Sequence, residues 1–202
     1  MRRVINSTYV SLDGVIEHLE KWHFDYLDED ANALVWDQLS ASDAVLMGRK
    51  SYEGHAEAWP GRTGAFAEKI NAMEKYVVST TMSRAEWNNT TVINGDLVEQ
   101  VTKLKHKPGK DILMWGFGPV AERLLEHGLL DKLCLWIHPV LVGIGGQGDL
   151  LFRPGISSKL KLVGNRTFDS GVVVLTYRPE AAAGESDVAA PDEDERTRTH
   201  AG

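Results

Sequence analysis

The sequence predicts a single-domain α/β fold with a mostly parallel central sheet, helices on its faces and an antiparallel hairpin at its C-terminal end. Short apolar runs alternate with amphipathic segments along most of the 202 residues, a length that is enough to bury one full core. Several runs are apolar at every position, which is typical of strands covered on both faces. The last two runs are joined by Phe-Asp-Ser-Gly at 168–171, a composition that indicates a turn.

Eight segments have the apolar character of strands. Six alternate with helical segments and are expected to form the parallel part of the sheet: Val4–Val10, Ala44–Met47, Tyr76–Ser79, Thr91–Ile93, Ile112–Trp115 and Leu133–Ile137. The other two, about Lys159–Thr167 and Val172–Tyr177, flank the turn at 168–171 and are expected to form the hairpin.

Three segments carry the pattern of amphipathic helices. Asp30–Leu39 places its apolar residues on one face. Asp96–Lys105 begins with Asp96 and Glu99 at the spacing of a capping box. Pro119–His127 starts with proline and stops before a glycine, which is the expected placement of these residues at the two ends of a helix.

Composition limits the class of protein. The net charge of −7 is concentrated after residue 179, where seven acidic residues face two arginines, so residues 1–179 are predicted to be the domain and residues 180–202 a disordered acidic tail. The nearly neutral body does not indicate a nucleic-acid partner. No run approaches the ~20 apolar residues of a membrane span. The single Cys134 suits a reducing compartment, so we expect a cytoplasmic protein.

In a parallel sheet the ligand crevice lies at the carboxyl ends of the strands, so the residues after each strand are the candidates for function. Gly48-Arg49-Lys50-Ser51 follows the second strand and combines a helix start with two cations and a hydroxyl, which suits a phosphate; the alternative is a turn with solvated cations. Ser79 and Thr80 follow the third strand and suit a ribose or 2′-phosphate, or cap the next turn.

The motif Gly116-Phe117-Gly118-Pro119-Val120-Ala121 after the fifth strand has the spacing of a dinucleotide fingerprint. An ordinary Rossmann site needs this motif in the first βαβ unit and an acid at the tip of the next strand. Here other βα units precede it, and the next strand ends in Trp136-Ile137-His138. These facts argue against a Rossmann fold, but close approach of backbone at the glycines and a helix dipole from Pro119 still suit a ligand.

A glycine-containing loop, Ser11–Ile16, follows the first strand and leads into a segment with Trp22, His23, Phe24 and Tyr26. Such a loop at the carboxyl edge of a sheet is typical of an element that covers a substrate. The alternative is an inert surface loop whose aromatic residues belong to the core.

Together these motifs resemble the dihydrofolate reductase fold, and more closely the reductase domain of riboflavin biosynthesis, the RibD C-terminal family. The resemblance covers about residues 2–178 and rests on five motifs in chain order. They are Ser11-Leu12-Asp13-Gly14, Met47–Glu53, Val78-Ser79-Thr80-Thr81, Trp115-Gly116-Phe117-Gly118, and Pro139–Gly146 running to Leu151-Phe152. The last motif favours the riboflavin-type branch.

The resemblance implies NADPH as hydride donor. It assigns phosphate contacts to Gly48, Arg49, Lys50 and Ser51, and the 2′-phosphate end to Ser79 and Thr80. The pyrophosphate and neighbouring ribose would be held by Gly116, Phe117, Gly118, Pro119 and Val120, with Val15 and Ile16 beside the nicotinamide and Trp115 flanking the reaction centre.

The catalytic acid is less defined. The position where dihydrofolate reductases carry a carboxylate is near Asn32, which is not an acid. Asp30 lies close by, although its ordinary role is helix N-terminal charge. Asp13 is the alternative acid, and its other role would be turn formation before Gly14. We therefore expect Asp13 and Trp115 at the reaction centre, with Trp22, Asp30 and Asn32 as substrate contacts.

The predicted function is an NADPH-dependent reductase of a small heterocyclic substrate, with 5-amino-6-(5-phosphoribosylamino)uracil as the substrate that the family implies. Its phosphate would need further cations, for which Lys21, Arg62 and Arg153 are candidates. The alternatives are a dihydrofolate or pteridine reductase, and a nucleotide-binding protein without turnover. The resemblance also implies a homodimer. No metal site is expected, because the seven histidines show no metal-ligand spacing.

Overall fold

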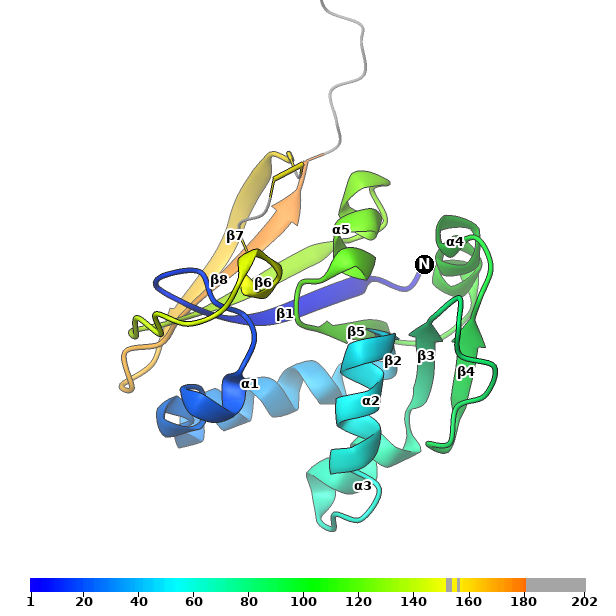
Figure 1. The fold of residues 1–202 in the computed structure, drawn as a ribbon, viewed down its shortest axis with the longest axis horizontal. Coiled ribbons are helices and arrows are strands. Elements are labelled where there is room, and N and C mark those ends of the chain that lie inside the picture. The colour runs from blue at the N-terminus through cyan, green and yellow to red at the C-terminus, as the bar shows by residue number, and fades with distance from the viewer. Residues whose placement is uncertain (152–153, 156, 181–202) are drawn as a thin grey trace, which may run out of the picture.

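A single twisted sheet forms the centre of the computed structural model, which describes residues 1–151, 154–155 and 157–180 (Figure 1). Its strand order is β4-β3-β2-β5-β1-β6-β8-β7. The strands are β1 (Val4–Ser11), β2 (Ser42–Gly48), β3 (Glu74–Val78), β4 (Thr90–Ile93), β5 (Asp111–Trp115), β6 (Lys132–His138), β7 (Leu160–Thr167) and β8 (Val173–Pro179). The first six run parallel, and β8 is antiparallel to β6 and β7. The predicted fold class is confirmed.

Helices cover both faces of the sheet. One face carries α1 (Glu29–Ser40), α2 (Arg49–Ala58) and α3 (Ala65–Ala72), and the other carries α4 (Leu97–His106) and α5 (Pro119–Glu126). Strand β5 shows the two faces directly, because Ile112 and Met114 join the core under α4 and α5 while Leu113 and Trp115 join the core on the opposite side. Short 3-10 turns occur at η1 (Leu19–Lys21), η2 (Phe24–Tyr26) and η3 (Gln147–Asp149).

The predicted strands and helices are all present, with bounds that shift by a few residues. The turn at 168–171 is closed by the N–H of Gly171, which donates to the carbonyl of Phe168 at 2.9 Å, and Gly171 supplies the positive φ of 84° that the turn requires. The predicted acidic tail lies outside the described residues apart from Glu180. No helix in the described ranges is both long and apolar enough to cross a membrane.

Two of the helices that follow a strand begin with an aspartate cap. Asp28 accepts a hydrogen bond from the N–H of Ala31 at 2.7 Å at the start of α1, and Asp96 accepts one from the N–H of Glu99 at 2.7 Å at the start of α4. Each cap satisfies an N–H that the helix itself leaves without a partner. The predicted start of α4 is confirmed, although the Glu99 carboxylate pairs with Lys103.

Helix α3 was not predicted. It has eight residues, its first turn follows Gly64 without a side-chain cap, and its buried positions are Ala67 and Ile70 alone. A short helix with two buried positions and no capping residue leaves a weak periodic signal in the sequence.

Candidate active site

Two helices begin on glycine side by side at the carboxyl edge of the sheet. Strands β2 and β5 pair in parallel, so the helices that follow them, α2 and α5, start next to each other. A Cβ atom on Gly48 would lie 3.5 Å from Cγ2 of Val120, in the first turn of α5. Neither Gly48 nor Gly118 caps its helix with a side chain. The N–H groups at both helix starts and the two helix dipoles therefore favour an anion such as a phosphate.

The glycines of the 116–118 motif differ in their roles. Gly116 has a φ of 75°, its N–H donates to the carbonyl of Ser7 at 3.1 Å, and its own carbonyl accepts from the Asn6 amide at 2.7 Å, so it shapes the turn and ties β5 to β1. The side chain of Phe117 is buried in the core. A Cβ atom on Gly118 would meet nothing within 4 Å, so open space lies at the start of α5.

Arg49 connects the start of α2 with the end of β3. Its Nη1 donates to the hydroxyl of Thr81 at 2.6 Å, and its Nε lies 2.7 Å from the carboxylate of Glu53. The side chain of Arg49 is half exposed, so a cation stands beside the hydroxyls that follow β3. The buried hydroxyl of Ser79 accepts from the N–H groups of Thr81 and Met82 at 3.3 and 3.0 Å, which is the turn-capping alternative, whereas Thr80 is exposed.

Lys50 points in a different direction from Arg49. Its Nζ lies 3.0 Å from the carboxylate of Glu17, in the segment after β1, so the two cations at the start of α2 reach opposite sides. Among the further cations considered from the sequence, the Arg62 guanidinium lies 5.0 Å over the ring of Trp59, Lys21 is exposed in η1, and Arg153 lies outside the described residues.

Asp13 fastens the loop after β1 to the segment after β6. Its carboxylate accepts hydrogen bonds from the hydroxyl of Ser11 at 2.5 Å and from the N–H groups of Gly143 and Val142 at 2.7 and 3.1 Å. These three donors, the Ser11 hydroxyl first, lower the pKa of Asp13 to about 2. Because it holds no proton at neutral pH, the position predicted for an acid is occupied by an anion that holds two loops together.

Val15 and Ile16 belong to the same loop. Val15 forms a bridge with Leu150, and the N–H of Ile16 donates to the carbonyl of Asp149 at 2.8 Å. Both side chains are buried. The loop is therefore held by backbone contacts to residues 149 and 150, and its two apolar side chains belong to the core.

Trp115 stands at the end of β5 and stacks on a histidine that the sequence analysis missed. The rings of Trp115 and His55 have centroids 5.0 Å apart and lie within 6° of parallel. His55 comes from α2, and its Nδ1 lies 2.7 Å from the carbonyl of Ser51. Both side chains are partly buried, and burial lowers the pKa of His55. The sequence signal that could have identified His55 is its position four residues after Ser51, on a helix that starts at the candidate site.

Trp22 lies in a buried aromatic cluster on the other side of β1. Its ring, which is 5% exposed, meets the ring of His138 edge-on at 5.0 Å, and Nδ1 of His23 lies 2.9 Å from Nε2 of His138. Nδ1 of His138 must donate to the carbonyl of Trp136, 2.9 Å away, so Nε2 of neutral His138 accepts from His23. Burial, with a smaller effect from His138, lowers the pKa of His23 to about 4, and burial also lowers that of His138.

Asp30 and Asn32 lie at the exposed start of α1. Asp30 is 3.8 Å from the guanidinium of Arg166 on β7, and the Asn32 amide donates to the carbonyl of Asp28 at 2.8 Å. Three strands, β8, β6 and β1, separate β7 from β5 in the sheet. The structure therefore places these two predicted substrate contacts apart from Trp115 and the glycine-started helices.

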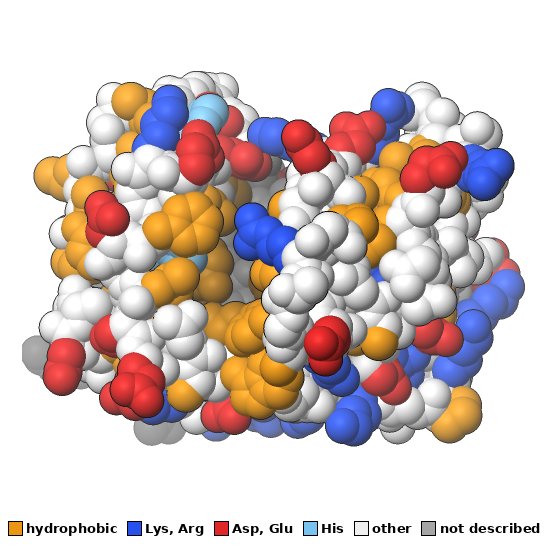
Figure 2. All heavy atoms as spheres, turned by 90° about the horizontal axis from the view of Figure 1, so that it is seen from below, with side chains coloured by type: hydrophobic (Ala, Val, Ile, Leu, Met, Phe, Trp, Pro, Cys, Tyr) orange, Lys and Arg blue, Asp and Glu red, His pale blue; other side chains and the backbone are white. Residues whose placement is uncertain are grey.

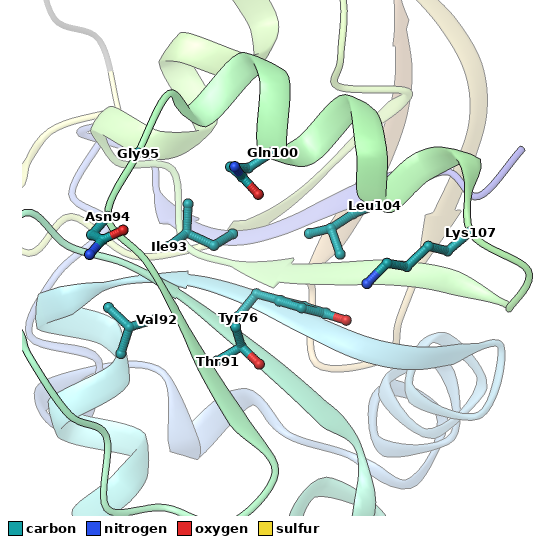
Figure 3. A pocket seen from close by; sticks show the side chains of 9 residues that line it. All are labelled: Tyr76, Thr91, Val92, Ile93, Asn94, Gly95, Gln100, Leu104 and Lys107. Carbon is teal, nitrogen blue, oxygen red and sulfur yellow. The ribbon is translucent and has the colours of Figure 1, made fainter.

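Two hollows are visible in the part of the surface that the structure describes. Figure 2 looks at the face that carries α1, α2 and α3, where a groove with apolar side chains separates the two halves of the molecule. A second hollow of about 200 Å³ lies between β4 and α4, with Asn94 and Gly95 at one end and Lys107 at the other (Figure 3). None of the predicted site residues lines this second hollow, and the helix beside it is already capped by Asp96. No group of metal-ligating side chains occurs within the described ranges.

Comparison with known proteins agrees with this architecture. The sequence matches the RibD C-terminal domain family over residues 2–174. It is 35% identical over 181 residues to the uncharacterized protein YyaP of Bacillus subtilis (strain 168), across 87% of this chain and 94% of that protein.

Solved structures share the fold. A putative riboflavin biosynthesis protein from Shewanella sp. PV-4 has a TM-score of 0.64 at 20% identity, over 90% of this chain and all of that one (100%). The diaminohydroxyphosphoribosylaminopyrimidine deaminase/5-amino-6-(5-phosphoribosylamino)uracil reductase of Thermotoga maritima has a TM-score of 0.61 at 18% identity, over 88% of this chain and 56% of that one.

Proposed function

The chain belongs to the RibD C-terminal domain family, and we propose that it is an NADPH-dependent reductase of a small heterocyclic substrate of the riboflavin-pathway type. One observation carries the proposal: α2 and α5 start side by side on glycine, with Arg49 beside the end of β3. Two free helix starts next to a guanidinium match a ligand that carries a pyrophosphate and a separate phosphate.

The residues present suit this cofactor. The pyrophosphate would lie at the first turns of α2 and α5, contacted by backbone from Gly48 to Ser51 and from Gly118 to Val120, while Gly116 and the buried Phe117 keep the turn in shape. Arg49 with the exposed Thr80 would hold the 2′-phosphate, a planar donor set that discriminates NADPH from NADH. Lys50 would contact phosphate from the other side by exchanging its partner Glu17.

The chain contributes position more than acid–base chemistry. Bound NADPH would supply the hydride. Asp13 holds the loop of Val15 and Ile16 against the segment after β6, and Trp115 bounds the place where the substrate would lie. Hydride transfer depends chiefly on this positioning, so a dedicated acid from the protein is not indispensable.

Two alternatives predict different outcomes. A dihydrofolate or pteridine reductase would oxidise NADPH when a pterin is added. A nucleotide-binding protein without turnover would bind NADPH but would not oxidise it, whichever substrate is added. The test is to follow the absorbance of the reduced nicotinamide after adding 5-amino-6-(5-phosphoribosylamino)uracil or dihydrofolate to the protein. We expect turnover with the aminouracil. Turnover with dihydrofolate alone, or with neither compound, would contradict the proposed substrate class.

We also propose that the protein acts in the cytoplasm as a homodimer. Strands β6 and β8 lie inside the sheet, whereas Leu162 and Val163 on the edge strand β7 are 48% and 47% exposed and could pack against a second copy. Light scattering of the purified protein measures the oligomeric state, and a monomeric mass would contradict the dimer.

A further inference from the structure

His55 is held in one orientation by two neighbours. Its Nδ1 lies 2.7 Å from the carbonyl of Ser51 one turn earlier in α2, and its ring is stacked on Trp115. A carbonyl oxygen can only accept, so Nδ1 carries the proton in this contact. In the neutral ring Nε2 is then a hydrogen-bond acceptor, and among the described residues no group donates to it.

The surroundings of His55 place it where a substrate would lie. His55 lies six positions after Arg49 in α2, which corresponds to about 9 Å along the helix axis. Trp115, on which it stacks, directly precedes the turn that starts α5. The His55–Trp115 pair is thus tied to both helices of the phosphate-binding edge, a short distance from where the phosphates would sit.

The region on the other side of β1 is occupied by its own aromatic side chains. Trp136 is 1% exposed, stacks on Phe168 with centroids 5.7 Å apart, and donates from Nε1 to the hydroxyl of Ser7 at 2.9 Å. Tyr9 stacks on His23 at 3.8 Å. The rings of Tyr9, His23, Trp136 and Phe168 pack against one another in that region, whereas Nε2 of His55 has no donor among the described residues.

We propose that His55 is a substrate-contacting residue, and that its Nε2 accepts a hydrogen bond from an N–H group of an aminouracil ring packed against the His55–Trp115 pair. This inference rests on the proposed function and adds the group that orients the substrate. An aminopyrimidine matches because it is planar and carries ring and exocyclic N–H donors. Neutral imidazole suits the role, and burial, which lowers the pKa of His55, keeps it neutral.

Substitutions at His55 separate the hydrogen bond from the packing. His55→Phe keeps an aromatic ring for Trp115 but removes the acceptor, whereas His55→Gln places a carbonyl oxygen near the position of Nε2. His106→Phe is a matched control, because Nδ1 of His106 makes the same contact with the carbonyl of Thr102 at 2.7 Å on the exposed end of α4.

The experiment measures the affinity of 5-amino-6-(5-phosphoribosylamino)uracil by calorimetry with NADP⁺ present, so that no reduction occurs. We expect His55→Phe to weaken binding by about 3- to 10-fold, as for the loss of one neutral hydrogen bond. His55→Gln should restore most of the affinity, and His106→Phe should bind like the unsubstituted protein. All variants should keep the thermal shift produced by NADPH.

Two results would overturn the inference while leaving the proposed function intact: equal affinity in His55→Phe and the unsubstituted protein, or equal losses in His55→Phe and His55→Gln. Neither result alters the thermal shift produced by NADPH. Absence of that shift, or no binding of the aminouracil by the unsubstituted protein, instead contradicts the proposed function itself, so the two failures are distinguishable.

Discussion

The carboxyl edge of the sheet has two halves that differ in how their polar groups are satisfied. Around β1 and β6, Asp13 is held by three donors, and His23, His138, Trp136 and Ser7 are bonded to one another or to backbone. Around β2 and β5, two helices start on glycine with no side-chain cap. The first half is closed by its own side chains, and the second leaves backbone donors for a ligand.

The helices show the same difference. Four of the helices follow a strand. Helices α1 and α4 begin with an aspartate that accepts a hydrogen bond from the N–H three residues later, while α2 and α5 begin with glycine. An aspartate cap would put a carboxylate where an anionic ligand must sit. Glycine at these two positions therefore leaves each helix start without a side-chain cap and without a carboxylate that would repel an anion.

The largest effect is expected when α5, in the half around β2 and β5, is given an aspartate at its start like those of α1 and α4. Gly118→Asp should weaken NADPH binding by about 100-fold, because two unit charges 4 Å apart repel by roughly 1 to 4 kcal/mol between bulk water and a protein surface. A Cβ atom at Gly118 meets nothing within 4 Å, so the fold should tolerate the substitution. Calorimetry measures the affinity, and an unchanged affinity in a folded variant would rule out a phosphate at this helix start.

A smaller effect is expected at the other end of the cofactor. Arg49→Ala should weaken the binding of NADPH by about 10-fold more than the binding of NADH, since a charge-assisted hydrogen bond contributes roughly 1.5–3 kcal/mol. Lys50→Ala is the matched comparison, because Lys50 faces Glu17 rather than Thr81 and should affect both nucleotides alike. Equal losses of NADPH and NADH affinity in Arg49→Ala would move Arg49 from the 2′-phosphate to the pyrophosphate.

The buried histidines in the half around β1 and β6 should make the stability of the protein depend on pH. Burial lowers the pKa of His23 to about 4 in the folded protein and also lowers that of His138. A histidine in the unfolded chain has a pKa of about 6.5. The unfolded chain then binds more protons in this interval, so the free energy of unfolding should fall as pH drops from about 6.5 to about 4. Urea unfolding over this range measures it. A His23→Gln variant should lose part of the dependence, and a flat profile in the unsubstituted protein would contradict the buried neutral pair.

The smallest effect is expected from removing a cap in a helix that has one. Asp96→Ala should lower the free energy of unfolding by about 1 kcal/mol, the usual cost of losing a helix N-cap, and should leave NADPH affinity unchanged. Urea unfolding and calorimetry on the same sample measure both quantities. A large loss of NADPH affinity in this variant would mean that the cofactor lies at α4 and beside the hollow of Figure 3 instead.

Much of the fold was predictable because its signals are local. The strands are continuous apolar runs, and Asp96, Pro119 and the 168–171 turn mark boundaries through short-range chemistry. In the candidate site, the helix starts at Gly48 and Gly118 were predictable because they depend on backbone. These positions need only a strand, a glycine and a helix in order.

The contacts of side chains across the sheet were not predictable in the same way. That Asp13 meets the N–H groups of residues 142 and 143, that Arg49 meets Thr81, and that His55 meets Trp115 follows from strand order and from which way each side chain points. The sequence marks His138 only as the end of a strand and gives no role to His55. His55 stacks on Trp115 and His138 is buried in an aromatic cluster, because aromatic neighbours far along the chain decide the surroundings of each.

If the carboxyl edge between β2 and β5 binds NADPH, the nucleotide must stabilise the folded protein, and thermal unfolding of the unsubstituted protein with and without NADPH measures this. A ligand present at about 100 times its Kd stabilises the native state by about 2.7 kcal/mol, which raises the Tm of a domain of this size by about 5–10 °C. We predict such a rise with NADPH and a smaller one with NADH at the same concentration. An unchanged Tm with both nucleotides would show that this edge of the sheet binds neither of them.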